Sequence, residues 1–183
     1  MTDQAITGGQ YCVKGLVQQL LVGLDRGLTV IIDKTVENGP MLVAATMTLE
    51  PPAGGDHDVE TPAERIVEQV KIRTNGMAWT PGEIAEEVLP DLVKAVRDSD
   101  GIVTRYRLVT DGALNCDTLL ALAARLRDRP IPGDALAALD DEDRRAFYYG
   151  RWLSVRGFFL ALMRRADIAD AGRFWRLIAG FDA

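Results

Sequence analysis

The run of residues 65–72, with the sequence RIVEQVKI, constrains the fold most, because it predicts a β-strand with polar side chains at fixed positions. Alternate residues of a strand point to opposite faces, so Gln69 and Lys71 share one face while Glu68 and Val70 share the other. Asp58 precedes Lys71 by thirteen residues, in the acidic turn at 54–60. A carboxylate, an amide oxygen and a lysine at the ends of neighbouring strands can hold a cation such as Mg²⁺ beside a phosphodiester.

Each part of this pattern also has an ordinary structural interpretation. A polar residue and a lysine two positions apart are common on the solvated face of an edge strand. An acidic turn is often solvated and has no ligand. The order of the surrounding elements is therefore needed to choose between the two interpretations.

The composition permits one hydrophobic core but no general basic surface. The chain has 183 residues, of which 48% are hydrophobic, and a formal net charge of −6. Residues 1–112 carry 10 Lys and Arg against 17 Asp and Glu, whereas residues 113–183 carry 11 arginines against 10 acidic residues. Contact with a polyanion would depend on local patches, and the arginine-bearing C-terminal part is the better place for them.

Several classes of site are poorly supplied by this sequence. Cys12 and Cys116 are far apart without metal-type spacing, and His57 is the only histidine, which argues against zinc sites and histidine-based catalysis. Cys12 falls on an apolar helix face and is expected to be a core thiol. No signal peptide precedes the first helix and no apolar run reaches about 18 residues. We therefore expect a cytoplasmic protein without a membrane segment.

The periodicity predicts two parts, an α/β core over residues 1–112 and a helical extension over 113–183. A first helix is expected at 10–25, closed by Gly27 as a C-cap. A helix from Thr80 to about Ser99 begins with a capping box and is kinked or divided at Pro90. Strands are predicted at 28–36, at 41–49, from residue 59, at 66–72 and at 103–110.

Everything after residue 112 has helical spacing. Helices are predicted at 118–127 and 135–139, followed by a longer helix that starts after the acidic residues 140–143, and a last helix around 174–178. Large side chains recur at helical spacing along the longer helix and are expected to be core residues rather than a base-stacking surface: Tyr148, Trp152, Val155, Phe159 and Leu162.

The order helix, strand, strand with an acidic end, strand with Gln-X-Lys, helix, strand resembles the PD-(D/E)XK nuclease superfamily. It resembles most closely the Mrr-like variant, in which Gln replaces the acidic residue, and more narrowly the double-stranded-DNA endonuclease domain at the N-terminus of bacterial anti-phage effectors. The resemblance covers roughly residues 6–112 and implies a restriction-endonuclease-like core, a central mixed β-sheet flanked by helices. The matching residues are GGQY at 8–11, DVE at 58–60, QVK at 69–71 and RLVTD at 107–111.

The resemblance also implies roles for individual residues. Asp58 would be the metal-binding carboxylate, Gln69 would supply the second side-chain oxygen, and the carbonyl of Val70 could add a ligand. Lys71 would position or activate water. Gln10 matches a polar position on the first helix that approaches the metal in relatives. The implied cofactor is Mg²⁺ or Mn²⁺.

Two assignments within the site stay open. Asp56 competes with Asp58 for the metal, because both lie in one short acidic turn. Glu68 would be the acidic residue if the strand register shifted by one, since that shift exchanges the faces. Gln69 brings no charge, so we expect weak metal affinity without DNA. Candidate phosphate contacts are Arg73, Arg144, Arg145, Arg151 and Arg156.

The activity implied by the resemblance is metal-dependent hydrolysis of double-stranded DNA with little sequence specificity. Such a nuclease requires control, by self-association or by a sensor or oligomerisation domain beyond residue 183. Two alternatives stay open: a nuclease-like scaffold without catalysis, and a small partner-binding domain, which the acidic N-terminal half favours. The sequence does not decide whether Ala183 is a natural terminus or the end of an N-terminal domain.

Overall fold

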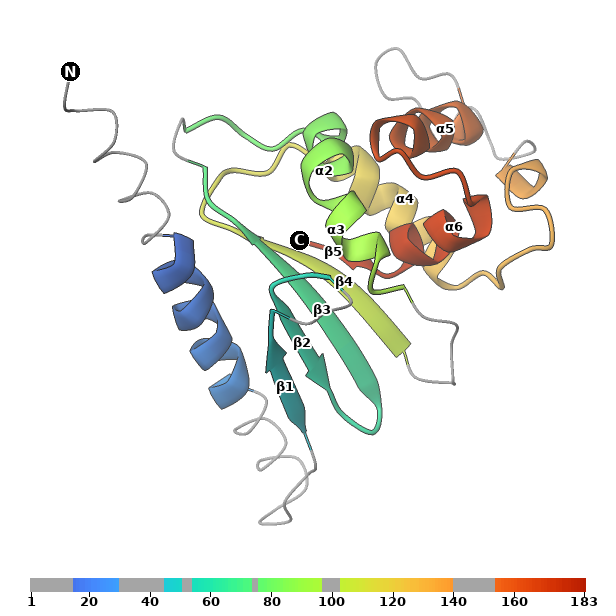
Figure 1. The fold of residues 1–183 in the computed structure, drawn as a ribbon. Coiled ribbons are helices and arrows are strands. Elements are labelled where there is room, and N and C mark those ends of the chain that lie inside the picture. The colour runs from blue at the N-terminus through green and yellow to red at the C-terminus, as the bar shows by residue number, and fades with distance from the viewer. Residues whose placement is uncertain (1–14, 30–44, 51–53, 74–75, 97–102, 140–153) are drawn as a thin grey trace.

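The computed structural model describes residues 15–29, 45–50, 54–73, 76–96, 103–139 and 154–183, which form an α/β fold around a mixed β-sheet (Figure 1). The strand order is β1-β2-β3-β4-β5. Antiparallel pairing joins β1 to β2 and β2 to β3, whereas β4 runs parallel to both β3 and β5. The strands are β1 (Thr46–Leu49), β2 (His57–Glu60), β3 (Glu64–Lys71), β4 (Val103–Thr110) and β5 (Phe181–Asp182).

A tight turn fixes the register between β2 and β3. The Thr61 hydroxyl donates to the Glu64 carbonyl at 3.0 Å and accepts from the Glu64 N–H at 3.0 Å. Asp58 consequently lies opposite Val67, and His57 lies opposite Glu68. This register decides which acidic residues share a face with Gln69 and Lys71.

Parallel strands need a crossover, and helices α2 (Pro81–Glu87) and α3 (Leu89–Val93) provide it between β3 and β4. The predicted capping box is confirmed: the Thr80 side chain accepts from the Glu83 N–H, and the Glu83 side chain accepts from the Thr80 N–H. The predicted division near Pro90 is also confirmed, because α2 ends at its C-cap Val88 and Pro90 lies in the first turn of α3.

The C-terminal part packs on the same core as the crossover helices. Its helices are α4 (Asp117–Arg127), the 3₁₀ helix η1 (Ala137–Leu139), α5 (Val155–Arg165) and α6 (Ala171–Ala179). Phe159 and Phe174 meet edge to face, with ring centroids 4.9 Å apart. Buried residues of α2 to α6 form one cluster with Val67, Tyr106 and Leu108 of the sheet. Val155, Phe159 and Leu162 are buried as predicted, whereas Tyr148 and Trp152 lie outside the described residues.

The two faces of the sheet have different coverings (Figure 1). The helices α2 to α6 lie on the face that buries Val67. A helix over residues 15–29, blue in Figure 1, lies on the other side and pairs through Arg26 with Glu68. None of the helices in the described residues has the combined length and apolar character needed to cross a bilayer.

Three predictions about the elements need correction. The first helix continues through Gly27 to residue 29, so Gly27 is not its C-cap and the strand predicted at 28–36 cannot start at Leu28. The described part of the strand predicted at 41–49 is β1, which agrees with that prediction and is not one of the three. The C-terminal part is not wholly helical, because Phe181 and Asp182 pair with β4. Residues 10–14, 30–44 and 140–153 lie outside the described residues.

Candidate functional site

The candidate site lies where β3 extends past the end of β2. Pairing between these strands stops at His57 and Glu68, and β3 continues to Lys71. The preceding loop reaches this position through Gly54 (φ 106°) and Gly55 (φ 80°). A Cβ on Gly54 would lie 2.3 Å from the Asp91 carbonyl oxygen, so only glycine fits between this loop and α3.

Asp56 is the acceptor at the centre of the site. Gln69 Nε2 and the Val70 N–H each donate to Asp56 Oδ2 at 2.6 Å. Gln19 Nε2, from the helix over residues 15–29, donates to Asp56 Oδ1 at 2.7 Å. Three segments distant in sequence therefore meet at this one carboxylate.

The surroundings of Asp56 disfavour its charge in the absence of a cation. Burial raises the pKa of Asp56, and this effect outweighs the Val70 N–H and the positive charge of Lys71, which lower it. The nearby carboxylate of Asp91 raises the pKa further. A bound cation would relieve both unfavourable effects.

Lys71, at the end of β3, pairs with Asp91 and acts electrostatically on Asp56. Its Nζ is 3.7 Å from Asp91 Oδ2, and its side chain is 29% exposed. Asp91 also pairs with Lys94, whose Nζ lies 3.2 Å from Asp91 Oδ1. The Lys71 ammonium is therefore not buried in the apolar interior, and its pairing with Asp91 of α3 restricts its position. Its positive charge lowers the pKa of Asp56.

Asp58, which the sequence favoured as the metal ligand, does not contact Gln69. Arg65 Nε donates to Asp58 Oδ1 at 3.0 Å and to Oδ2 at 3.1 Å. Arg65 NH1 donates to the Ala95 carbonyl at 2.9 Å, and both members of the ion pair are buried. Of the two aspartates, Asp56 therefore contacts Gln69, whereas Asp58 neutralises the buried charge of Arg65.

Glu68, the alternative acidic residue, belongs to the opposite face of the sheet. Its side chain is 1% exposed, with Oε1 3.1 Å from Arg26 Nε and 3.2 Å from Arg107 NH1. His57 Nδ1 lies 3.6 Å from Glu68 Oε2. The register that would exchange the faces is not the one observed, so Glu68 points away from Lys71.

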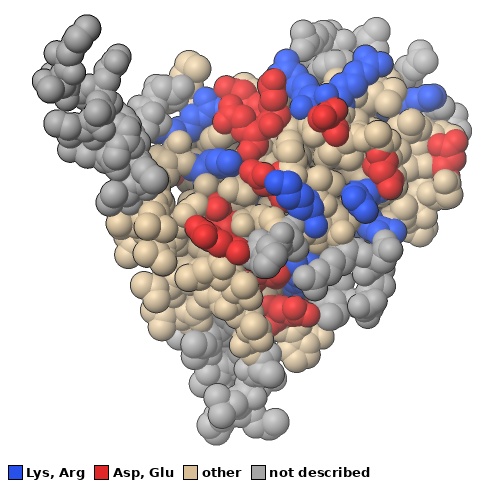
Figure 2. Space-filling view, viewed as in Figure 1, with Lys and Arg blue, Asp and Glu red and all other residues tan. Residues whose placement is uncertain are grey.

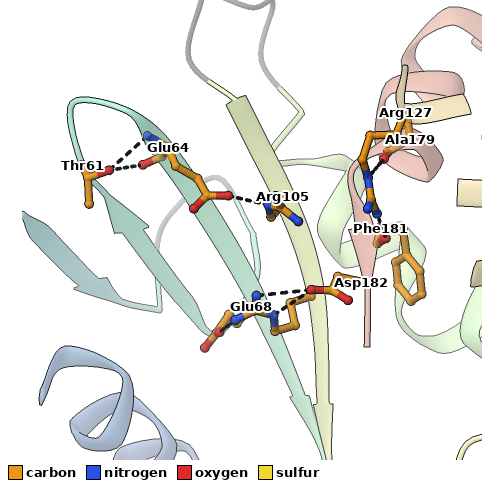
Figure 3. Close-up of polar contacts among 9 residues, drawn as sticks. Thr61, Glu64, Glu68, Arg105, Arg127, Ala179, Phe181 and Asp182 are labelled. Carbon is orange, nitrogen blue, oxygen red and sulfur yellow. Dashed lines mark hydrogen bonds and ion pairs between the residues drawn. The ribbon is translucent and has the colours of Figure 1, made fainter. Parts of the chain in front are cut away.

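Glu68 is part of a row of ion pairs across three strands (Figure 3). Arg107 on β4 pairs with Glu68 and, through NH2 at 3.2 Å, with Asp182 on β5. Arg105 on β4 pairs with Glu64 on β3. This row ties the short strand β5 to the centre of the sheet.

The charge of Glu68 is expected to stabilise the fold in a pH-dependent way. Burial opposes its ionisation, but His57, Arg26 and Arg107 together lower the pKa of Glu68 below its ordinary value of 4.5. Its stabilisation is thus complete above that value and is lost as the pH falls through the folded-state pKa. We expect Glu68→Gln to lose about 1–3 kcal/mol at pH 7, with the difference from wild type shrinking at acid pH in urea titrations. A difference that grows at acid pH would contradict this assignment.

The predicted phosphate contacts are only partly described. Arg73 is committed elsewhere: its side chain is 8% exposed, NH2 lies 3.0 Å from Glu83 Oε1, and its guanidinium lies 3.9 Å from the Trp79 ring centroid. It could not reach a phosphate without breaking these contacts. Arg156 lies partly buried on α5. Gln10, Arg144, Arg145 and Arg151 lie outside the described residues.

Two residues of the site were not anticipated from the sequence. Gln19 donates to Asp56 from the first helix, whereas Gln10 lies outside the described residues; the sequence signal for Gln19 was a Gln18-Gln19 pair within an apolar helix. Asp91 contacts Lys71 from α3, and no local pattern indicated that contact.

The described surface carries mixed charges. Acidic and basic side chains lie interspersed over the upper part of the face shown in Figure 2, and the lower left is mostly uncharged. Within the described ranges, no group of three or more His, Cys, Asp or Glu side chains is arranged to hold a metal ion. A cation would therefore need amide, main-chain or substrate oxygens as well.

Comparison with protein-family models, curated proteins and solved structures gave no match.

Proposed function

We propose that this chain is a metal-dependent endonuclease domain that hydrolyses double-stranded DNA phosphodiesters with little sequence specificity. One observation supports the proposal most: Asp56 accepts hydrogen bonds from Gln69 and Val70. The positive charge of Lys71, two residues beyond Gln69 on the same strand, also acts on this carboxylate. These are the groups expected from the resemblance to Mrr-like nucleases, with Asp56 in the role first given to Asp58. Among the described residues, the order of the first helix, β1, β2, β3, the crossover helices and β4 is compatible with that resemblance.

The residues at the site fit a weakly held hard cation. Carboxylate, amide and carbonyl oxygens are the ligands that Mg²⁺ and Mn²⁺ accept. Gln69 now donates through Nε2, and a half-turn of its amide would present Oε1 instead. The Val70 N–H points toward Asp56, and the carbonyl of a strand residue points to the same edge as its N–H. With one carboxylate and no charge on Gln69, affinity in the absence of DNA should be low.

The remaining chemistry is assigned to side chains of this chain. Lys71 would orient the attacking water and stabilise the negative charge that develops on the phosphate. Asp91 limits the positions of the Lys71 side chain, and Gln19 holds the second oxygen of Asp56. When bound, the cation would supply Lewis acidity toward a phosphate oxygen and a water molecule.

Plasmid cleavage tests the proposal directly. Supercoiled plasmid is incubated with Mg²⁺ or Mn²⁺ and with wild type, Lys71→Ala or Lys94→Ala. We expect Lys71→Ala to lose about 10²–10³-fold in cleavage rate, because charge stabilisation at the phosphate is lost. Lys94→Ala is the matched control: it removes the other lysine that pairs with Asp91 and should cleave like wild type. Equal cleavage by all three proteins would indicate a contaminant and refute the assignment of Lys71.

A second candidate function is a nuclease-like scaffold that binds DNA or a protein partner without catalysis. The absence of a three-ligand acidic or histidine group among the described residues favours it. A gel-shift experiment separates the two: DNA binding that is unaffected by EDTA, without cleavage under any metal condition, would support the scaffold. Absence of both binding and cleavage would leave a partner-binding domain.

The biological setting belongs to the same proposal. A nuclease with little sequence specificity needs control, as in the bacterial anti-phage effectors that the sequence resembles. We propose a cytoplasmic antiviral role, with activity released by a sensor domain or by assembly. Affinity for DNA would come mainly from phosphate contacts and would fall steeply with salt.

A further inference from the structure

The helix over residues 15–29 presents an apolar face to solvent. Its inward side carries Gln19, Gly23 and Arg26, which contact the sheet or the loop beside it. Its outward side carries six large apolar residues, named here the leucine stripe. They are Leu16 (50% exposed), Val17 (48%), Leu20 (44%), Leu21 (58%), Leu24 (65%) and Leu28 (58%).

This orientation reverses the usual arrangement of a surface helix. A helix on a sheet normally buries its apolar stripe and exposes its polar residues. Here the attachment is polar at both ends, through Gln19 to Asp56 and Arg26 to Glu68. At the middle, a Cβ on Gly23 would lie 3.0 Å from Met47 Cε and 3.1 Å from His57 Nε2, so the helix backbone approaches the sheet closely. These contacts fix the side that faces inward and leave the leucine stripe outward.

We infer that the leucine stripe is the contact surface between two copies of this chain. Taking a fully exposed leucine as about 200 Å², the stripe exposes roughly 600 Å² per copy, at the upper limit for patches on monomers. Two copies would remove roughly 1,200 Å² from water, the lower limit for a stable specific interface.

The spacing of the stripe makes it complementary to itself. Leu16, Leu20, Leu24 and Leu28 form a ridge with a spacing of four residues, and Val17 and Leu21 form a second. Ridges of this spacing pack into the grooves between the same ridges of another helix. Because both partners present the same surface, the contact closes as a two-fold dimer. The stripe carries no charge, which disfavours DNA as its occupant.

Gln19 lies on the helix that would form the dimer interface. Fixing this helix therefore also fixes the donor to Asp56 Oδ1. The inference itself rests on the exposed stripe and holds whether or not the proposed nuclease activity is correct.

Sedimentation velocity on the full chain over a range of concentrations tests the inference. Wild type is expected to dimerise in the micromolar range, and Leu20→Glu/Leu24→Glu to raise the dimer Kd by at least about 30-fold. Ile131→Glu is the matched control, since Ile131 is 42% exposed outside the stripe, and it should dimerise like wild type. Wild type that stays monomeric up to about 100 µM would overturn the inference.

A second measurement does not depend on the charged variant folding. Leu20→Cys and Leu24→Cys, each with Cys12→Ser, are treated with a flexible bismaleimide under native conditions. Cys116 is buried and should stay unreactive. Covalent dimers from both variants, and none from Ile131→Cys, are expected. Dimerisation without cross-linking at either position would overturn the assignment to the stripe. Evidence that residues of the same chain or another protein cover the stripe would overturn it too.

Discussion

Replacement of Asp56 by asparagine is expected to reduce metal-dependent cleavage at least about 10³-fold without unfolding the protein. Asparagine has the shape of aspartate, so its Oδ1 can accept from Gln69 Nε2 and the Val70 N–H. Its Nδ2 would face Gln19, whose amide can turn to accept the hydrogen bond. Only the negative charge is removed, and that charge is what the proposed cation requires.

The same substitution has a predicted effect on stability, with a sign opposite to that of most buried changes. Burial raises the folded-state pKa of Asp56, so its stabilisation is present below the ordinary value of 3.8 and is lost as the pH rises through the folded-state pKa. At pH 7 the ionised group therefore weakens the metal-free fold. Asp56→Asn should be at least as stable as wild type in urea at pH 7, and this advantage should shrink toward pH 4.

Metal binding gives a readout that does not depend on cleavage. Mn²⁺ or Mg²⁺ at millimolar concentrations should raise the thermal midpoint of wild type and leave that of Asp56→Asn unchanged, because a ligand stabilises only the state that binds it. Asp56→Asn that cleaves plasmid like wild type would remove Asp56 from the site. An equal response of both proteins to the metal would place the cation elsewhere.

Asp58→Ala is expected to cost about 3–5 kcal/mol in the free energy of unfolding, since it leaves Arg65 buried without its counter-ion. Arg65 is 3% exposed and would keep only the Ala95 carbonyl among its stated partners. Urea titration at neutral pH measures the loss. Asp58→Asn should be less severe, because its oxygen can still accept from the guanidinium.

The double variant Asp58→Ala/Arg65→Met separates a structural from a chemical role. Removing both charges should recover much of the lost stability, as when a buried ion pair is replaced by apolar groups. If Asp58 is structural, the cleavage rate per folded molecule of the double variant stays near that of wild type. If the double variant folds but does not cleave, the proposed role of the cation-binding carboxylate would belong to Asp58 and not to Asp56.

One strand of the sheet and the helices that follow it could be predicted because their sequence patterns are local. The strand predicted at 66–72, which is β3 (Glu64–Lys71), the capping box at Thr80 and the break near Pro90 each depend on neighbouring residues. The shared face of Gln69 and Lys71 follows from strand alternation alone. These features survive any choice of tertiary packing.

The different partners of the two aspartates could not be predicted, because alternation gives Asp56 and Asp58 the same face. What separates them is the register that sets Asp58 near Arg65, a contact across two strands. The contacts of Arg73 could not be predicted for a similar reason: Glu83 on α2 and Trp79, which precedes that helix, both contact its guanidinium. Pairings of this kind are decided by folding, not by spacing.

The helix over residues 15–29 shows the limit of amphipathic patterns. Apolar spacing predicted a helix, and the helix exists, but the same spacing would have placed its leucines against the sheet. Gly27 failed as a C-cap because glycine is tolerated inside a helix whose ends are set elsewhere. A pattern identifies the apolar side of a helix, whereas its contacts decide what that side meets.

The different lengths of β2 and β3 have a consequence for how such a site could be gained or lost. Val70 offers its main-chain N–H to Asp56 at a position where the neighbouring strand has already ended. If β2 were longer by two residues, the Val70 N–H would instead donate to a main-chain carbonyl of that strand. An insertion or deletion near Gly54 and Gly55 could thus erase the proposed chemistry while every participating side chain stayed in the sequence.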